Sequence, residues 1–114
     1  MKIRNKKFVY LISPNKIKDN SFFYYLSLVL RTNKVRFFQL RLKKETIKRK
    51  TFIAKKVQII CKKYRVKFII NDDPHFTLKI KADGCHLGQK DMSISDARKI
   101  IGNKIIGVTC HNSI

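Results

Sequence analysis

Polar and apolar residues alternate between Phe38 and Lys43, where the sequence reads Phe-Gln-Leu-Arg-Leu-Lys. In an extended strand, a period of two places Gln39, Arg41 and Lys43 on one face. The Arg guanidinium offers a planar fork that matches phosphate oxygens, and the Lys ammonium adds a point charge. The three residues therefore predict an anion-binding site. The alternative is an edge strand that exposes one face to water.

Two aspartates that follow apolar segments suggest a cation site nearby. Asp72 follows Ile69-Ile70-Asn71, and Asp91 follows Leu87-Gly88-Gln89-Lys90. Adjacent parallel strands lie about 4.8 Å apart, so loops after consecutive strands can bring two carboxylates to one ion. Mg²⁺ takes one or two carboxylates together with substrate phosphates. We therefore expect Asp72 and Asp91 to share Mg²⁺, although each alone is typical of a loop residue or helix cap.

The cysteines give no comparable pattern. Cys61, Cys85 and Cys110 are odd in number and form no C-x-x-C pair, which argues against a disulfide framework or a zinc site. Cys85 and His86 are neighbours on an expected strand, where adjacent side chains point to opposite faces, so they cannot form a nucleophile–base pair. We expect the thiols to be packing residues.

Short apolar runs alternate with helical patterns along the chain, and these elements must position the polar residues. Such alternation predicts right-handed crossovers and a parallel sheet, which fits either a doubly wound sheet or a barrel. No Gly-x-Gly-x-x-Gly follows the first strand, so a dinucleotide fold has no specific support. In both folds the active site lies at the carboxyl ends of the strands. Strands are expected over 8–12, 35–43, 67–71, 84–87 and 105–109, and helices over 21–31, 45–64, 74–80 and from a cap at Ser93 to Ile101.

The composition fits one α/β domain of 114 residues with a formal net charge of +20. That charge makes a nucleic-acid-binding module an alternative, but the basic residues are dispersed and the longest unbroken run is Lys48-Arg49-Lys50. We therefore expect no nucleic-acid partner. No apolar stretch reaches 18 residues and no secretory signal is evident, so a cytoplasmic protein without membrane contact is expected.

Several motifs together resemble the thiamine-phosphate synthase family, in its order and spacing. The segment Gln39–Lys43 is similar to its Gln-Leu-Arg-x-Lys strand, and Asn71-Asp72 to its Asn-Asp motif. The run Ala82–Asp91 resembles its Ala-Asp-Gly-x-His-x-Gly-Gln-x-Asp sequence, and 105–111 its fifth strand. Retention of both acidic motifs favours the synthase over the related thiazole tautomerases. The resemblance implies that residues 1–114 form the N-terminal part of a (β/α)₈ TIM barrel, about five strands of eight.

The resemblance also implies a reaction and its small-molecule substrates. A hydroxymethylpyrimidine pyrophosphate would be joined to a thiazole phosphate, giving thiamine phosphate and pyrophosphate. Asp72 and Asp91 would hold Mg²⁺. The remaining roles fall to Arg41, Lys43 and Asn71 at the pyrophosphate and to Gln39 and Thr109 near the pyrimidine.

The length of the chain leaves further alternatives open. A complete barrel of this type needs about 200–250 residues, and the thiazole-phosphate loops of the family would lie beyond Ile114. The chain is therefore expected to be a truncated or split synthase, completed by a homo-oligomer or by a separately supplied C-terminal half. A non-catalytic relic that binds only the pyrimidine pyrophosphate is the alternative.

Overall fold

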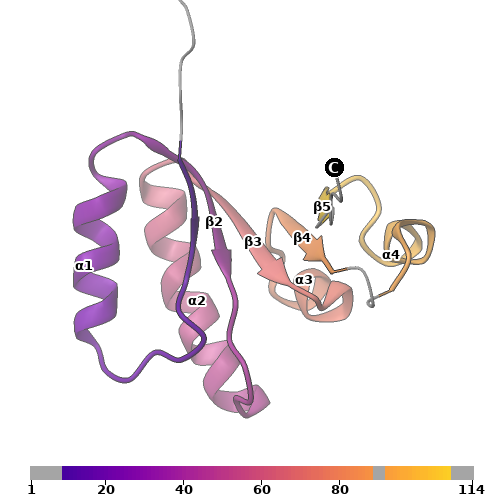
Figure 1. Ribbon diagram of the computed structural model, residues 1–114, viewed down its shortest axis with the longest axis horizontal. Coiled ribbons are helices and arrows are strands. Elements are labelled where there is room, and N and C mark those ends of the chain that lie inside the picture. The colour runs from indigo at the N-terminus through magenta and orange to yellow at the C-terminus, as the bar shows by residue number, and fades with distance from the viewer. Residues whose placement is uncertain (1–8, 89–91, 109–114) are drawn as a thin grey trace, which may run out of the picture.

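Each strand of the sheet pairs in parallel with the strand that follows it along the chain. The computed structural model describes residues 9–88 and 92–108 (Figure 1). Its five strands lie in the order β1-β2-β3-β4-β5. They are β1 (Val9–Ile12), β2 (Val35–Leu40), β3 (Lys67–Asn71), β4 (Gly84–Leu87) and β5 (Ile105–Val108).

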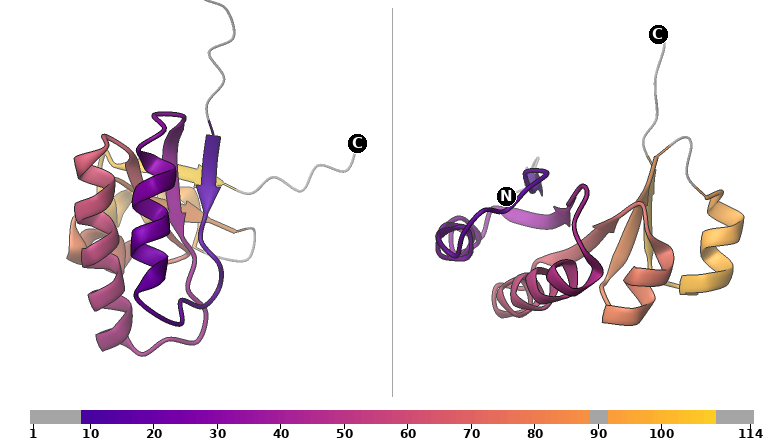
Figure 2. Two further views of the ribbon diagram at one scale, coloured as in Figure 1. Left: turned by 90° about the vertical axis from the view of Figure 1, so that its left-hand side faces the viewer. Right: turned by 90° about the horizontal axis from the view of Figure 1, so that it is seen from below.

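The four described helices lie on one face of this sheet, as Figure 2 shows in the view from below. A doubly wound sheet carries helices on both faces and reverses its strand order, whereas a barrel keeps consecutive order with all helices outside. The arrangement is therefore that of a partial (β/α)₈ barrel, as predicted. The helices are α1 (Ser21–Leu30), α2 (Ile47–Lys63), α3 (Pro74–Ile80) and α4 (Ile94–Ile101).

Three of these helices begin at a side chain that accepts a backbone N–H. Thr46 Oγ1 accepts from Arg49 N at 3.2 Å, and Asp73 Oδ1 accepts from Phe76 N at 2.9 Å. Ser93 Oγ accepts from Asp96 N at 3.1 Å, which confirms the predicted cap.

No helix within residues 9–88 and 92–108 is long and apolar enough to cross a membrane.

Most element bounds agree with the sequence prediction, but the second strand is shorter than expected. The strand predicted over 35–43 ends at Leu40. Beyond it, Arg41 N donates to Ser13 Oγ at 2.8 Å, and Lys43 N donates to the Asn15 carbonyl at 3.0 Å. The loop after β1 thus takes the N–H groups that a longer strand would have offered to the sheet.

The two faces of the sheet differ in their packing. Phe38 and Phe68 point toward the helices and are fully buried with the apolar residues of α1 and α2. A second, smaller cluster joins Cys85 and Leu87 to α4. The opposite face corresponds to the interior of a barrel. The outer strands β1 and β5 expose apolar side chains, as expected for an open sheet: Val9, Tyr10, Ile12, Ile105 and Val108.

Candidate active site at the carboxyl ends of the strands

Gln39 lies inside the sheet, on the face away from the helices. Its side chain is 2% exposed, and its Nε2 donates to the Tyr10 hydroxyl at 3.1 Å. Tyr10 stacks on Phe37 of the next strand, with 5.5 Å between ring centroids. Burial raises the pKa of the Tyr10 hydroxyl, and the hydrogen bond from Gln39 partly opposes that rise. Gln39 therefore places a buried, hydrogen-bonded amide below the carboxyl ends of the strands, where it could contact a ligand bound at those ends.

Arg41 and Lys43 lie just beyond the end of β2, in a loop rather than on the strand. Both side chains are exposed, while their backbone N–H groups are anchored to the loop after β1. The prediction that Gln39, Arg41 and Lys43 share one strand face is wrong beyond Gln39, because the strand ends at Leu40. Two exposed cationic side chains on a hydrogen-bonded backbone can still reach an anion at this edge.

Asn71 is the last residue of β3, and Asp72 follows it directly. Asp72 has a left-handed backbone conformation, with φ of 67°, which Asp tolerates better than most residues. Its N–H donates to the His86 carbonyl at 2.7 Å, which ties this turn to β4. In the ladder between β2 and β3, Leu40 is opposite Ile70. Arg41 therefore leaves its strand at the level where Asn71 ends β3.

Asp73, the next residue, has a structural task. It caps α3, and its Oδ2 lies 3.7 Å from Lys50 Nζ. The same ammonium lies 4.6 Å from the centroid of the Phe76 ring. Of the two adjacent carboxylates, Asp73 is thus committed to the helix, while the side chain of Asp72 is at the exposed turn.

Cys85 and His86 point to opposite faces, as predicted. Cys85 is fully buried against the helices. Burial raises the pKa of its thiol. Hydrogen bonds from the Thr77 side chain and the Asp73 backbone lower that pKa, while the negative charges of Asp73 and Asp72 raise it further. His86 is level with Asn71 on one side and Gly107 on the other. The prediction of a packing role is confirmed for Cys85, and likewise for the buried Cys61.

Two predicted site residues, Asp91 and Thr109, lie outside the described residues, and so does Cys110. Within 9–88 and 92–108, no three His, Cys, Asp or Glu side chains are grouped closely enough to hold a metal ion. The described part of the edge thus has Gln39 on β2, Arg41 just after that strand, Asn71 at the end of β3 and Asp72 just after it. The metal pair and the role of Thr109 stay predictions.

Sequence reasoning missed two residues that organise this edge. Tyr10 binds the Gln39 amide across β1 and β2, and Ser13 holds the backbone of Arg41. A period of two along β1 places Tyr10 on the same face as Ile12, which is opposite Gln39 in the ladder. Tyr10 and Gln39 therefore share one face of adjacent strands, and this pattern could have indicated a contact between their side chains. The contact made by Ser13 lies in a loop and had no comparable sequence signal.

The fold defines a class: a partial (β/α)₈ barrel, with cationic and carboxylate side chains following the carboxyl ends of its strands. Comparison with known proteins is more specific. The model of the thiamine monophosphate synthase family matches residues 9–114. Because this covers nearly the whole chain, the chain belongs to that family.

Individual relatives agree with this assignment. The chain is 66% identical over 110 residues to the thiamine-phosphate synthase of Pelagibacter ubique, covering 96% of this chain and 53% of that protein. It is 45% identical over 80 residues to the thiamine-phosphate synthase of Bacillus mycoides, covering 68% of this chain and 36% of that one. A solved thiamine phosphate pyrophosphorylase from Pyrococcus furiosus superposes with a TM-score of 0.78 at 28% identity, over 91% of this chain and 50% of its own. The chain thus spans about half the length of these relatives.

Proposed function

We propose that this chain forms the pyrimidine-pyrophosphate side of a thiamine-phosphate synthase. The observation that carries the proposal is the edge formed by β2 and β3, where Arg41 and Asn71 leave their strands at one level and Asp72 follows on a turn tied to β4. The family match supplies the reaction class. The substrates would be a hydroxymethylpyrimidine pyrophosphate and a thiazole phosphate, and the products thiamine phosphate and pyrophosphate, made in the cytoplasm.

The cationic side chains would stabilise the leaving pyrophosphate. Arg41 and Lys43 sit on a backbone anchored to the loop after β1, so their exposed side chains can close on the phosphates at little cost in backbone ordering. Asn71 would donate its amide N–H groups to the same oxygens. Fixed donors and cations lower the barrier because negative charge gathers on the pyrophosphate as it departs.

A divalent cation suits the donors at this edge. Asp72 offers a carboxylate and Asn71 an amide oxygen, the hard oxygen ligands that Mg²⁺ prefers. We assign Asp72 and Asp91 as the residues that would hold Mg²⁺. When bound, the ion would neutralise charge on the pyrophosphate. Asp73 is left out of this assignment because it caps α3 and pairs with Lys50.

The pyrimidine would lie over the amide of Gln39, with Thr109 beside it. As the C–O bond breaks, pyrophosphate leaves with the bonding electrons, and the thiazole nitrogen forms the new C–N bond with its lone pair. The buried Gln39 amide is held by Tyr10 at 3.1 Å, so it can position the ring without rearranging. The thiazole phosphate would be held by the part of the relatives that lies outside the aligned half.

A calorimetric titration with the pyrimidine pyrophosphate, with and without Mg²⁺, tests this proposal. Binding is expected to be saturable and stronger with Mg²⁺. Asp72→Asn should abolish the Mg²⁺-dependent part of the affinity, because the amide keeps the shape but removes the charge that holds the ion. Asp96→Asn is the matched control, since Asp96 is exposed on α4 and pairs only weakly with Lys99 at 4.0 Å.

Two results would count against the site. Binding without any Mg²⁺ dependence would remove the metal assignment. Equal affinity in Asp72→Asn and the wild-type chain would remove Asp72 from the site, whatever the fate of the rest.

A further inference from the structure

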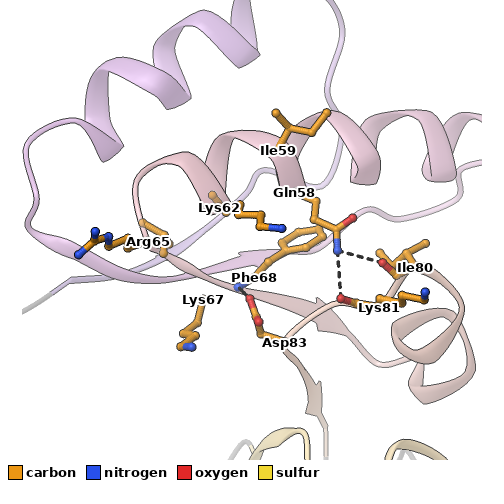
Figure 3. Close-up of a pocket in the computed structure, with 11 residues that line it drawn as sticks. Gln58, Ile59, Lys62, Arg65, Lys67, Phe68, Ile80, Lys81 and Asp83 are labelled. Carbon is orange, nitrogen blue, oxygen red and sulfur yellow. Dashed lines mark hydrogen bonds between the residues drawn. The ribbon is translucent and has the colours of Figure 1, made fainter.

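A cavity of about 750 Å³ lies at the opposite end of the sheet, where β3 begins. Its walls come from the end of α2, the turn into β3, the end of α3 and the turn into β4, as Figure 3 shows. Its volume lies in the range of small-molecule sites. Lys67 at the start of β3 lines it, whereas Asn71 ends the same strand about 13 Å away. The cavity is therefore separate from the candidate active site.

Four cations surround this cavity and one carboxylate lines it. Lys62, Arg65, Lys67 and Lys81 are the cations, and all four are exposed. The ion pairs found within the described residues involve Arg49, Lys50 and Lys99 instead.

The single carboxylate, Asp83, is already engaged. Its Oδ2 accepts from Phe68 N at 2.8 Å, and its own N–H donates to the Phe68 carbonyl at 2.9 Å. Asp83 is thus held against β3 and neutralises at most one of the four cations.

Helix ends offer a structural explanation for part of this charge. Cations at a helix C-terminus are favoured by the macrodipole, which amounts to about half a negative charge per helix. The ends of α2 and α3 together therefore offset about one positive charge. Subtracting that charge and the charge of Asp83 from four cations leaves about two positive charges without compensation. The helix ends alone do not account for the cluster.

Two of the cations occupy unusual backbone positions. Arg65 and Lys81 follow α2 and α3 with φ of 59° and 60°, where helices usually end in Gly or Asn. The Gln58 side chain donates to the carbonyls of Ile80 and Lys81 at 2.9 and 3.1 Å, which joins α2 to the end of α3 beside the cavity. In Figure 3, Lys62 extends over Phe68, while the ends of Arg65 and Lys67 point outward. Exposed side chains of this length can turn inward through ordinary rotamers.

We propose that this cavity is a second anion site, which binds a small molecule carrying a doubly charged phosphate group. The uncompensated charge matches such a dianion, and Arg65 provides the bidentate fork. Lys62 and Lys67 approach from either side of the turn into β3. The site is independent of the proposed reaction.

Inorganic phosphate at constant ionic strength is the probe, and backbone amide shifts of the ¹⁵N-labelled full chain are the readout. Saturable shifts are expected at 62–68 and 80–83. Arg65→Asn removes the charge with a residue that tolerates a positive φ, so the fold is retained. It should weaken binding about two- to fivefold, and with Lys67→Ala about tenfold, as expected for partly screened charges. Arg65→Lys should restore most of the affinity.

The control variants are Arg41→Ala, at the other end of the sheet, and Lys99→Ala, on α4. Neither should change phosphate affinity at the cavity. Shifts that grow linearly without saturation, or that spread over lysines throughout the chain, would overturn the proposal. Equal affinity in Arg65→Asn and the wild-type chain would overturn it as well.

Discussion

The two ends of the sheet are built from the same strands but are organised differently. At the carboxyl end, polar residues follow the strands directly, and backbone hydrogen bonds from Arg41 and Asp72 tie them to neighbouring loops and strands. At the amino end, the cations lie at the ends of α2 and α3, in the turn before β3 and at the first residue of that strand, around a cavity in which the Asp83 carboxylate accepts from Phe68 N. The carboxyl end carries the family motifs. The cavity at the amino end was recognised only from the structure.

Both ends of the sheet depend on β3, so the largest effect is expected from a substitution that disturbs the packing of this strand. Phe68 is the second residue of β3, is 1% exposed and packs against the helices. Phe68→Ala should lower the free energy of unfolding by about 3–5 kcal/mol, because it leaves a cavity in the core. Urea unfolding followed by circular dichroism measures it. Phe52→Ala on α2, which is 49% exposed, is the control and should cost far less.

If Phe68→Ala and Phe52→Ala proved equally stable, the packing of β3 against the helices would be wrong. The positions of both sites would then lose their support, because each is placed by one end of this strand.

Alanine substitutions at two glycines should lower the stability by smaller amounts, which differ between the two positions. A Cβ on Gly84, at the start of β4, would lie 2.5 Å from the Ile105 carbonyl oxygen, a backbone atom that cannot turn aside. A Cβ on Gly107 would lie nearest the His86 side chain, with its Cδ2 atom at 3.2 Å. Gly84→Ala should therefore cost about 1–3 kcal/mol, as overpacking does, and Gly107→Ala less. Thermal unfolding of both variants checks the order, and a reversed order would contradict the β4–β5 register.

The sequence predicted the strands and helices well because their signals are local. Pro74, the cap at Ser93 and the apolar run before Asn71 each act within a few residues, and α3 and β3 have the predicted bounds. The end of β2 was missed because its cause is distant: Ser13 and Asn15, in another loop, bind the backbone after Leu40. The cavity was missed because only the fold brings Lys81 and Asp83 beside the segment 62–67, which holds the other three cations.

A substitution with a smaller expected effect tests the hydrogen bond between Tyr10 and Gln39 at the carboxyl end of the sheet. Tyr10→Phe removes the hydroxyl that accepts from the Gln39 side chain and leaves that buried amide without this partner. We expect a loss of about 1 kcal/mol in the free energy of unfolding, the usual worth of one such hydrogen bond. Tyr24→Phe is the control, because Tyr24 is 62% exposed on α1. An identical unfolding curve for Tyr10→Phe and the wild-type chain would show that the Gln39 amide is not held as described.

Cys61 reports on the amino end without any ligand. Burial chiefly, and the Asp83 carboxylate in addition, raise the pKa of this thiol to about 12. A raised pKa means that the neutral thiol is favoured in the fold, so this contribution to stability is complete below the ordinary value of 9.0 and is lost as the pH rises from there toward 12. At pH 8 only about one thiol in 10⁴ is ionised. Iodoacetamide should therefore leave Cys61 unmodified in the native chain and modify it in urea, as peptide mapping by mass spectrometry can show.

Asp83→Asn sharpens this measurement into a test of the electrostatics around the cavity. The amide oxygen can still accept from Phe68 N, which the carboxylate binds at 2.8 Å, but the negative charge is gone. The pKa of Cys61 should fall, since one of the two causes that raise it is removed, and it should stay above 9.0 because burial is the larger cause. The pH dependence of alkylation at Cys61 gives the direction. A rise, or no change, would mean that Asp83 does not act on the cavity as its position implies, and the charge balance assigned to the four cations would have to be revised.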